Sequence, residues 1–117
     1  GATWHLVRTL GRKRAYELIV TGEKLPAARC QELGLCNRVV AADQLVTDTL
    51  TWAAELAGKA PLALRHAKEA LNFALEHELS ATIAEEARLQ KICINSADAK
   101  EGVEAFIGKR AAVWQGR

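Results

Sequence analysis

Proline is scarce in this sequence, and its scarcity favours helices over a loop-rich structure. Only two prolines occur among 117 residues, while 50% of the residues are hydrophobic and 26% are charged. This balance is typical of a folded globular protein and excludes a disordered chain. Alanine and leucine, both good helix formers, are abundant. The composition therefore indicates a mostly helical protein.

Cysteine is also sparse, and the three residues of this type form no CxxC pair. They are Cys30, Cys36 and Cys93. An odd and widely spaced set fits a reducing compartment better than a disulfide framework. We therefore expect a cytoplasmic protein.

Long apolar runs and a strong net charge are both missing. No apolar run approaches the roughly 20 residues that a membrane-spanning helix needs, so no membrane partner is expected. The formal net charge is only +2, and positive charges are interleaved with negative ones. Mixed charges are typical of solvated helix faces rather than of a nucleic-acid-binding surface. We therefore expect no nucleic-acid partner.

Recognisable catalytic motifs are absent as well. No GxGxxG or GxxxxGK[ST] phosphate loop occurs. His66 and His77 would lie about 16 Å apart along one helix, too far to bind one metal ion together. Glu85 and Glu86 are adjacent, and adjacent helix residues point about 100° apart, so they do not form a carboxylate pair. The residues alone therefore predict no catalytic residue and no metal in this chain.

Apolar residues at helical spacing predict five or six helices. We expect Gly22 and Gly34 to end the first two, and Pro61 to begin the fourth. Asp98 and Glu101 have the spacing of a capping box at the start of the last. The predicted helices cover residues 12–20, 26–33, 43–58, 61–78 and 80–94, with Ser80 as the cap of the fifth, and a last one from residue 96 or 98.

Two segments depart from a simple helical pattern. Residues 35–40 read as extended, at most one short strand whose pairing partner would lie elsewhere. The helix over residues 80–94 has apolar residues on two sides, which predicts burial on two sides, in a core or against another subunit. We therefore expect one all-α domain over residues 1–117, with a single short extended segment.

Several short motifs follow one another along the whole chain. Their order and spacing resemble the crotonase superfamily, the enoyl-CoA hydratase/isomerase proteins. At the family's second glycine, second alanine and usual valine, this sequence has Ala2, Cys30 and Cys36 instead. The matching residues are Gly1, Thr3, Leu6, Arg8 and Gly11, then Ala15, Glu17, Leu18, Thr21 and Gly22, then Ala27, Gly34 and Leu35, and finally "SADAKEGVEAFIGKR" at residues 96–110.

The resemblance implies that this chain is the C-terminal helical part of such an enzyme, the part that builds trimers or dimers of trimers and closes over acyl-CoA. The chain begins at Gly1 rather than at methionine, so we expect a piece of a longer protein. The spiral βαβ core, the backbone donors for the thioester oxygen and the acid–base glutamates would then lie upstream. The longer protein would hydrate 2-enoyl-CoA thioesters with no prosthetic group, and this chain alone would be inactive.

The resemblance also implies a coenzyme A contact at Phe106 and Lys109, the aromatic and basic residues of the family's A-F-x-x-K signature. An aromatic ring offers a stacking surface to adenine, and an ammonium offers a charge to phosphate. Three positions apart, the two residues are expected to share a helix face. In the competing interpretation Phe106 is a core residue and Lys109 a solvated helix end. For the whole chain, the alternative is a stand-alone helical interaction module without catalysis.

Overall fold

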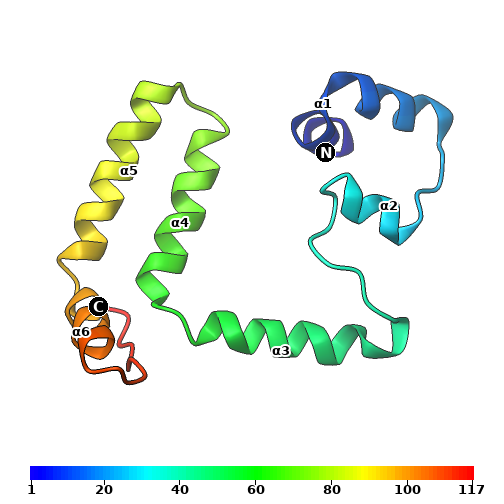
Figure 1. Cartoon of the computed structure of the whole chain (residues 1–117). Coiled ribbons are helices and arrows are strands. Elements are labelled where there is room, and N and C mark those ends of the chain that lie inside the picture. The colour runs from blue at the N-terminus through cyan, green and yellow to red at the C-terminus, as the bar shows by residue number, and fades with distance from the viewer. The chain divides into compact units, whose positions relative to one another are not determined.

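The computed structural model describes all 117 residues and contains helices but no strand (Figure 1). The all-α prediction is therefore confirmed. The chain forms two compact units, residues 1–48 and residues 49–117. The helices are α1 (Ala2–Thr21), α2 (Ala27–Glu32), the short 3-10 helix η1 (Ala42–Gln44), α3 (Leu45–Ala57), α4 (Pro61–Ala74), α5 (Leu79–Ile94) and α6 (Ala97–Ile107).

None of these helices combines the length and the hydrophobicity that crossing a membrane would require.

In the first unit, α1 is two helical stretches joined at a kink. Gly11 has φ 75° and ψ 162°, a backbone conformation that is accessible to glycine and interrupts the helix. The stretch after this glycine, which contains the fully buried Ala15, corresponds to the predicted helix over residues 12–20. The stretch before it was not predicted. Gly22 ends α1 in the left-handed conformation, with its N–H bonded to the carbonyl of Leu18, as predicted.

The segment after α2 is not a strand. Pro26 is extended (φ −62°, ψ 152°), so α2 begins one residue later than predicted. Gly34 (φ 75°) ends the helix, and the N–H of Leu35 returns to the carbonyl of Cys30 at 2.8 Å. Residues 35–40 then form bends and irregular backbone. An isolated extended segment has no ladder to join, which explains why no strand forms.

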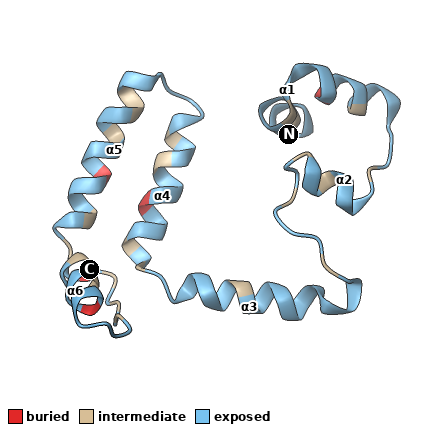
Figure 2. Ribbon diagram, viewed as in Figure 1, coloured by how far each residue is buried: buried red, intermediate tan, exposed pale blue.

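In the second unit, α4 and α5 run side by side in opposite directions, and α5 packs on α6 (Figure 1). Burial is confined to a few residues, among them Leu89 on α5 and Ala105 on α6, each 3% exposed (Figure 2). On α5, Ile83 and Ile94 are 54% and 62% exposed. The predicted burial of this helix on two sides is therefore not met within the chain, because only the side that bears Leu89 is covered.

The turn between α4 and α5 falls earlier than the sequence pattern indicated. His77 stacks on Phe73 with ring centroids 3.6 Å apart, and its Nδ1 lies 2.8 Å from the Phe73 carbonyl oxygen. These contacts occupy the last turn, and α4 ends at Ala74 rather than near Glu78. Helix α5 starts at Leu79, so Ser80 lies inside the helix and is not its cap.

The start of α6 is capped by a different residue from the one predicted. The hydroxyl of Ser96 accepts a hydrogen bond from the N–H of Ala99 at 3.0 Å, which makes Ser96 the N-cap. The predicted capping box of Asp98 and Glu101 is wrong. Both carboxylates instead bind the tail that follows α6: Asp98 accepts from the N–H groups of Gln115 and Gly116 at 2.6 and 2.9 Å.

The tail after α6 folds back on the second unit. The indole N–H of Trp114 donates to the carbonyl of Gly58, between α3 and α4, at 2.8 Å. The same ring lies so close to α6 that a Cβ on Gly102 would be 3.3 Å from it. The tail is thus held at several points, and its position fixes the end of α6.

Candidate functional site

Phe106 lies on the last turn of α6 and points away from the core. Its side chain is 86% exposed, the largest exposure among the exposed large hydrophobic residues. An aromatic ring this accessible contributes nothing to the packing of this chain, and it offers both faces to a ligand or to another protein. In this chain, therefore, the interpretation of Phe106 as a core residue is excluded.

Lys109 lies outside the helix. Helix α6 ends at Ile107, and Lys109 has φ 49°, the only positive φ of a residue other than glycine. The expectation that Phe106 and Lys109 share a helix face is therefore wrong, because the chain reverses between them. Lys109 is exposed, so its ammonium group is accessible on the turn that ends the helix.

This turn has the hydrogen bonds of a Schellman motif. The N–H of Lys109 donates to the carbonyl of Phe106 at 3.2 Å, and the N–H of Arg110 donates to the carbonyl of Ala105 at 3.0 Å. Gly108 precedes the left-handed position and remains right-handed (φ −75°). The position where glycine is usual in this motif is thus occupied by Lys109.

A carboxylate about two helical turns earlier binds the residue that follows Lys109. Glu101 and Arg110 form a bidentate ion pair, with Nη1 and Nη2 of Arg110 at 2.6 and 2.9 Å from the two carboxylate oxygens. The N–H of Val113 donates to the same carboxylate at 2.7 Å. These hydrogen bonds, that of Arg110 first, lower the pKa of Glu101 to about 2. Glu101 is therefore a fully charged anchor for the turn and the tail at neutral pH.

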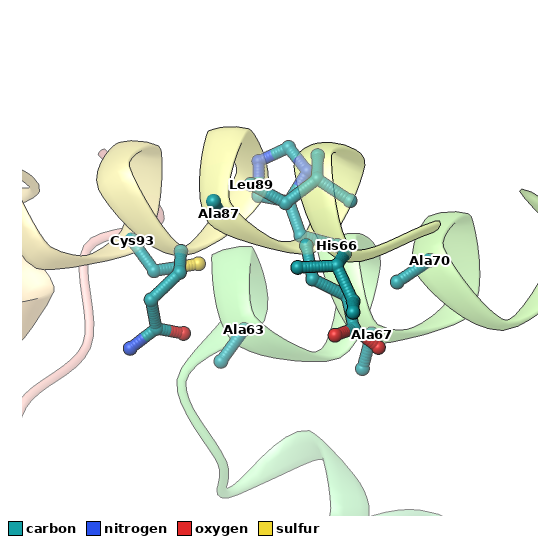
Figure 3. Close-up of a pocket in the computed structure, with 10 residues that line it drawn as sticks. Ala63, His66, Ala67, Ala70, Ala87, Leu89 and Cys93 are labelled. Carbon is teal, nitrogen blue, oxygen red and sulfur yellow. The ribbon is translucent and has the colours of Figure 1, made fainter. Parts of the chain in front are cut away.

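A second candidate region is a groove of about 630 Å³ between α4 and α5 (Figure 3). Small side chains leave the space open, as Figure 3 shows for Ala63, Ala67 and Ala70 on α4. The lining is mostly apolar, and so the groove resembles a packing surface more than a reaction centre. Its lining residues are Ala63, His66, Ala67, Ala70, Ile83, Glu86, Ala87, Leu89, Gln90 and Cys93.

The one buried histidine at this groove is part of a link between the two helices. Nδ1 of His66, which is 9% exposed, lies 2.9 Å from Glu69. Glu69 also accepts from Arg88 of α5 at 3.0 Å, and Arg88 pairs with Glu85 at 2.6 Å. The hydrogen bond with His66, aided by the charge of Arg88, lowers the pKa of Glu69. This cluster has the geometry of a structural brace rather than that of an acid–base pair facing a substrate.

The two helical histidines have unrelated surroundings. His66 bonds Glu69 within α4, whereas His77 lies beyond the end of α4 and bonds the Phe73 backbone. No group of three or more His, Cys, Asp or Glu side chains converges in a way that could hold a metal ion. The sequence analysis also missed the pairing of Glu101 with Arg110. Their separation of nine residues follows no helical or strand period, so no local pattern signals it.

The fold and the site define an all-helical protein whose last helix presents an accessible aromatic ring and is followed by a turn with an accessible lysine. The chain belongs to the enoyl-CoA hydratase/isomerase family, whose model matches residues 1–117. A crystal structure of enoyl-CoA hydratase from Bacillus anthracis superposes with a TM-score of 0.95 at 33% identity, covering 100% of this chain and 45% of that one. The helices of this chain thus superpose closely on part of a larger enzyme.

Curated relatives carry related names. The chain is 34% identical to the 2,3-dehydroadipyl-CoA hydratase of Escherichia coli K12 over 117 residues, which is 100% of this chain and 46% of that protein. It is 36% identical to the short-chain-enoyl-CoA hydratase of Clostridioides difficile over 106 residues, 91% of this chain and 68% of that protein. The chain spans 42% to 46% of the length of six matching relatives, among them the E. coli enzyme.

One part of the resemblance drawn from the sequence needs correction. The motifs had indicated the C-terminal helical part of such proteins only. The family model instead matches the whole chain, residues 1–117. The chain covers 42% of the length of one relative and 46% of another, and these shares state how much of each protein is matched. The assignment to a C-terminal trimerisation domain is therefore withdrawn, and the membership of the family is what stands.

Proposed function

We propose that this chain contributes a coenzyme A contact to an enzyme that hydrates 2-enoyl-CoA thioesters. The family match over residues 1–117 and relatives named as hydratases support the reaction class. The observation that carries the contact is the end of α6, where Phe106 is 86% exposed and Lys109 is held in the adjoining turn. In this proposal acyl-CoA is the substrate, and no prosthetic group is proposed.

In this proposal the chain's own residues bind rather than react. The ring of Phe106 would stack on the adenine, and the ammonium of Lys109 would pair with phosphate oxygens. Backbone donors for the thioester oxygen and glutamates that move the proton, which hydration needs, are proposed to lie outside this chain. We therefore expect coenzyme binding without turnover from the chain alone, in a cytoplasmic setting.

We further propose that the complete protein is a homotrimer or a dimer of trimers. This chain exposes large apolar side chains, which favours assembly with other protein surfaces. Among them are Leu79 on α5 and Ile107 on α6, each 75% exposed. The alternative is a stand-alone helical interaction module, which the same exposed surface would serve. A gene whose reading frame also encodes a βαβ core outside these residues favours the enzyme, and a gene that encodes only these residues favours the module.

An amide NMR titration of this chain with coenzyme A tests the proposed contact. We expect shifts clustered at Phe106 and Lys109, and Lys109→Ala should weaken binding about tenfold, the usual effect of losing one charged hydrogen bond. Lys100→Ala is the matched control, because Lys100 is 80% exposed on the same helix and lies 3.9 Å from Glu104. Crotonyl-CoA added to the same sample should remain unchanged.

Two results of this titration would contradict the proposal. Shifts that are absent, or that spread over both units without a centre at the end of α6, would remove the coenzyme contact. An equal loss of affinity in Lys100→Ala and Lys109→Ala would mean that binding depends on the overall positive charge and not on Lys109 in particular.

A further inference from the structure

Three helices of this chain end with a residue in the left-handed conformation. Gly22 after α1 and Gly34 after α2 have φ 63° and 75°, which cost glycine nothing. After α6 the left-handed residue is Lys109, with φ 49°. A side chain with a Cβ is disfavoured in this conformation, because the Cβ comes too close to the following carbonyl oxygen. The surroundings of Lys109 must therefore hold it there.

The contacts that hold this turn come from the residue after Lys109. The backbone N–H of Arg110 bonds the carbonyl of Ala105 at 3.0 Å, and its guanidinium bonds both oxygens of Glu101 at 2.6 and 2.9 Å. On the other side, the N–H of Gly108 bonds the carbonyl of Glu104 at 2.9 Å. With both neighbours bound to α6, the backbone of Lys109 has little freedom to leave the left-handed region.

The same contacts leave the charge of Lys109 available. The ion pairs of α6 and its tail join Lys100 to Glu104 and Arg110 to Glu101, and neither includes Lys109. Glu101 is neutralised by Arg110, so it does not compete with an anionic ligand for the Lys109 ammonium. A fixed backbone with an unpaired cation is the arrangement that recognition of a phosphate group favours, because little is left to order on binding.

We propose that Glu101 is a positioning residue, which acts through Arg110 to hold Lys109 in the left-handed turn where its ammonium meets the coenzyme phosphates. This inference rests on the coenzyme contact proposed above and adds a residue that touches no ligand itself. Its pair with Arg110 supplies the only side-chain bonds between the body of α6 and the turn.

Glu101→Gln tests the inference because positioning and simple electrostatics predict opposite signs. Removing a negative charge near an anion-binding lysine would tighten binding, whereas releasing the turn would weaken it. We expect the NMR signature of positive φ at Lys109, a strong intraresidue NOE between HN and Hα, to be lost. The Kd for coenzyme A should rise about twofold or more, from the lower end of the range of coupling between neighbouring groups upward.

Two further variants complete the test. Arg110→Gln breaks the same pair from the other side and should give the same two changes. Glu104→Gln is the matched control, since Glu104 lies on the same helix but pairs with Lys100, and it should change neither readout. In a Lys109→Ala background, Glu101→Gln should have no further effect on the Kd, because its influence passes through Lys109.

If the Glu101→Gln variant bound coenzyme A as tightly as the unsubstituted chain, or more tightly, the positioning role would be overturned while the coenzyme contact stands. The same conclusion would follow if Glu101→Gln weakened binding as much in the Lys109→Ala background as in the unsubstituted chain. Retention of the positive φ at Lys109 in both Glu101→Gln and Arg110→Gln would overturn it without any ligand. A lack of response to coenzyme A from the unsubstituted chain would overturn the contact itself, and the inference with it. The failures of the two proposals are thus distinguishable.

Discussion

At the scale of single residues, the carboxylates of Asp98 and Glu101 on α6 both bind the tail that follows the helix. The carboxylate of Asp98 is 3% exposed and accepts from two backbone N–H groups of the tail. Glu101 binds a side chain and a backbone group together. Each carboxylate satisfies donors that would otherwise need water, so both stabilise a tail that has no helix of its own.

Acid is expected to release the tail through Glu101. Its pKa is about 2 in the folded chain, below the ordinary value of 4.5. A lowered pKa means that the carboxylate stabilises the fold fully above about pH 4.5, and that this contribution is lost as pH falls toward 2. The amide resonance of Val113 should therefore keep its position through pH 4.5 and move only near pH 2.

Glu101→Gln is the control for this titration, and its Val113 resonance should show no acid transition of this origin. A midpoint at the ordinary carboxyl pKa in the unsubstituted chain would show that the bonds to Arg110 and Val113 do not hold the carboxylate in solution.

At the scale of helices, where each helix ends decides what its last turn can present. The Schellman turns after α2 and after α6 have the same bonds, and glycine occupies the left-handed position only in the first. In α6 the glycine comes one residue early, at Gly108. The helix therefore ends with a lysine in a conformation that costs stability, in a place where function can use it.

Lys109→Gly is expected to stabilise the chain while weakening its binding of coenzyme A about tenfold, as Lys109→Ala does. Glycine relieves the left-handed strain, a gain of about 1 kcal/mol in the free energy of unfolding, which urea unfolding would measure. Lys109→Ala is the matched control, because it removes the same ammonium but keeps a Cβ, and it should bring no such gain. Equal stabilities of the two variants would contradict the assigned strain.

The helices themselves were largely predictable, and their ends were not. The apolar spacing of residues 12–20, 61–78 and 80–94 located α1 in part, α4 and α5. The first predicted helix began after Gly11, and so the helical stretch before that glycine was not predicted. The end of α4 was misplaced because stacking of His77 on Phe73 competes with continuation of the helix. Such end effects depend on single contacts, which periodicity does not report.

At the scale of the whole molecule, the open apolar surface is the main feature. Within the second unit, Leu79, Ile94 and Val103 are 75%, 62% and 60% exposed. The hydrophobic residues that are buried, Ala15, Leu89 and Ala105, include only one large side chain. Exposed apolar surface of this kind marks contact with other protein, which agrees with relatives of about twice the length.

The isolated chain is therefore expected to bind a hydrophobic dye and to self-associate. Dye fluorescence should rise on addition of the folded chain, and sedimentation should give a mean mass that grows with concentration. Ile107→Ser, which removes one exposed apolar side chain from α6 (75% exposed), should reduce both effects. A monomer at every concentration, together with no dye binding, would contradict the exposure of these faces in solution.

The sequence by itself determined the helical class and the family, because both depend on the order and spacing of residues along the chain. It also singled out Phe106 and Lys109, which remain the proposed coenzyme contacts. Only the tertiary structure decided that α6 ends at Ile107, that Lys109 is left-handed, and that Glu101 binds Arg110. These features arise where a tail folds back onto a helix, and contacts between residues 9 to 18 positions apart, such as Asp98 with Gly116, have no periodic trace in a sequence.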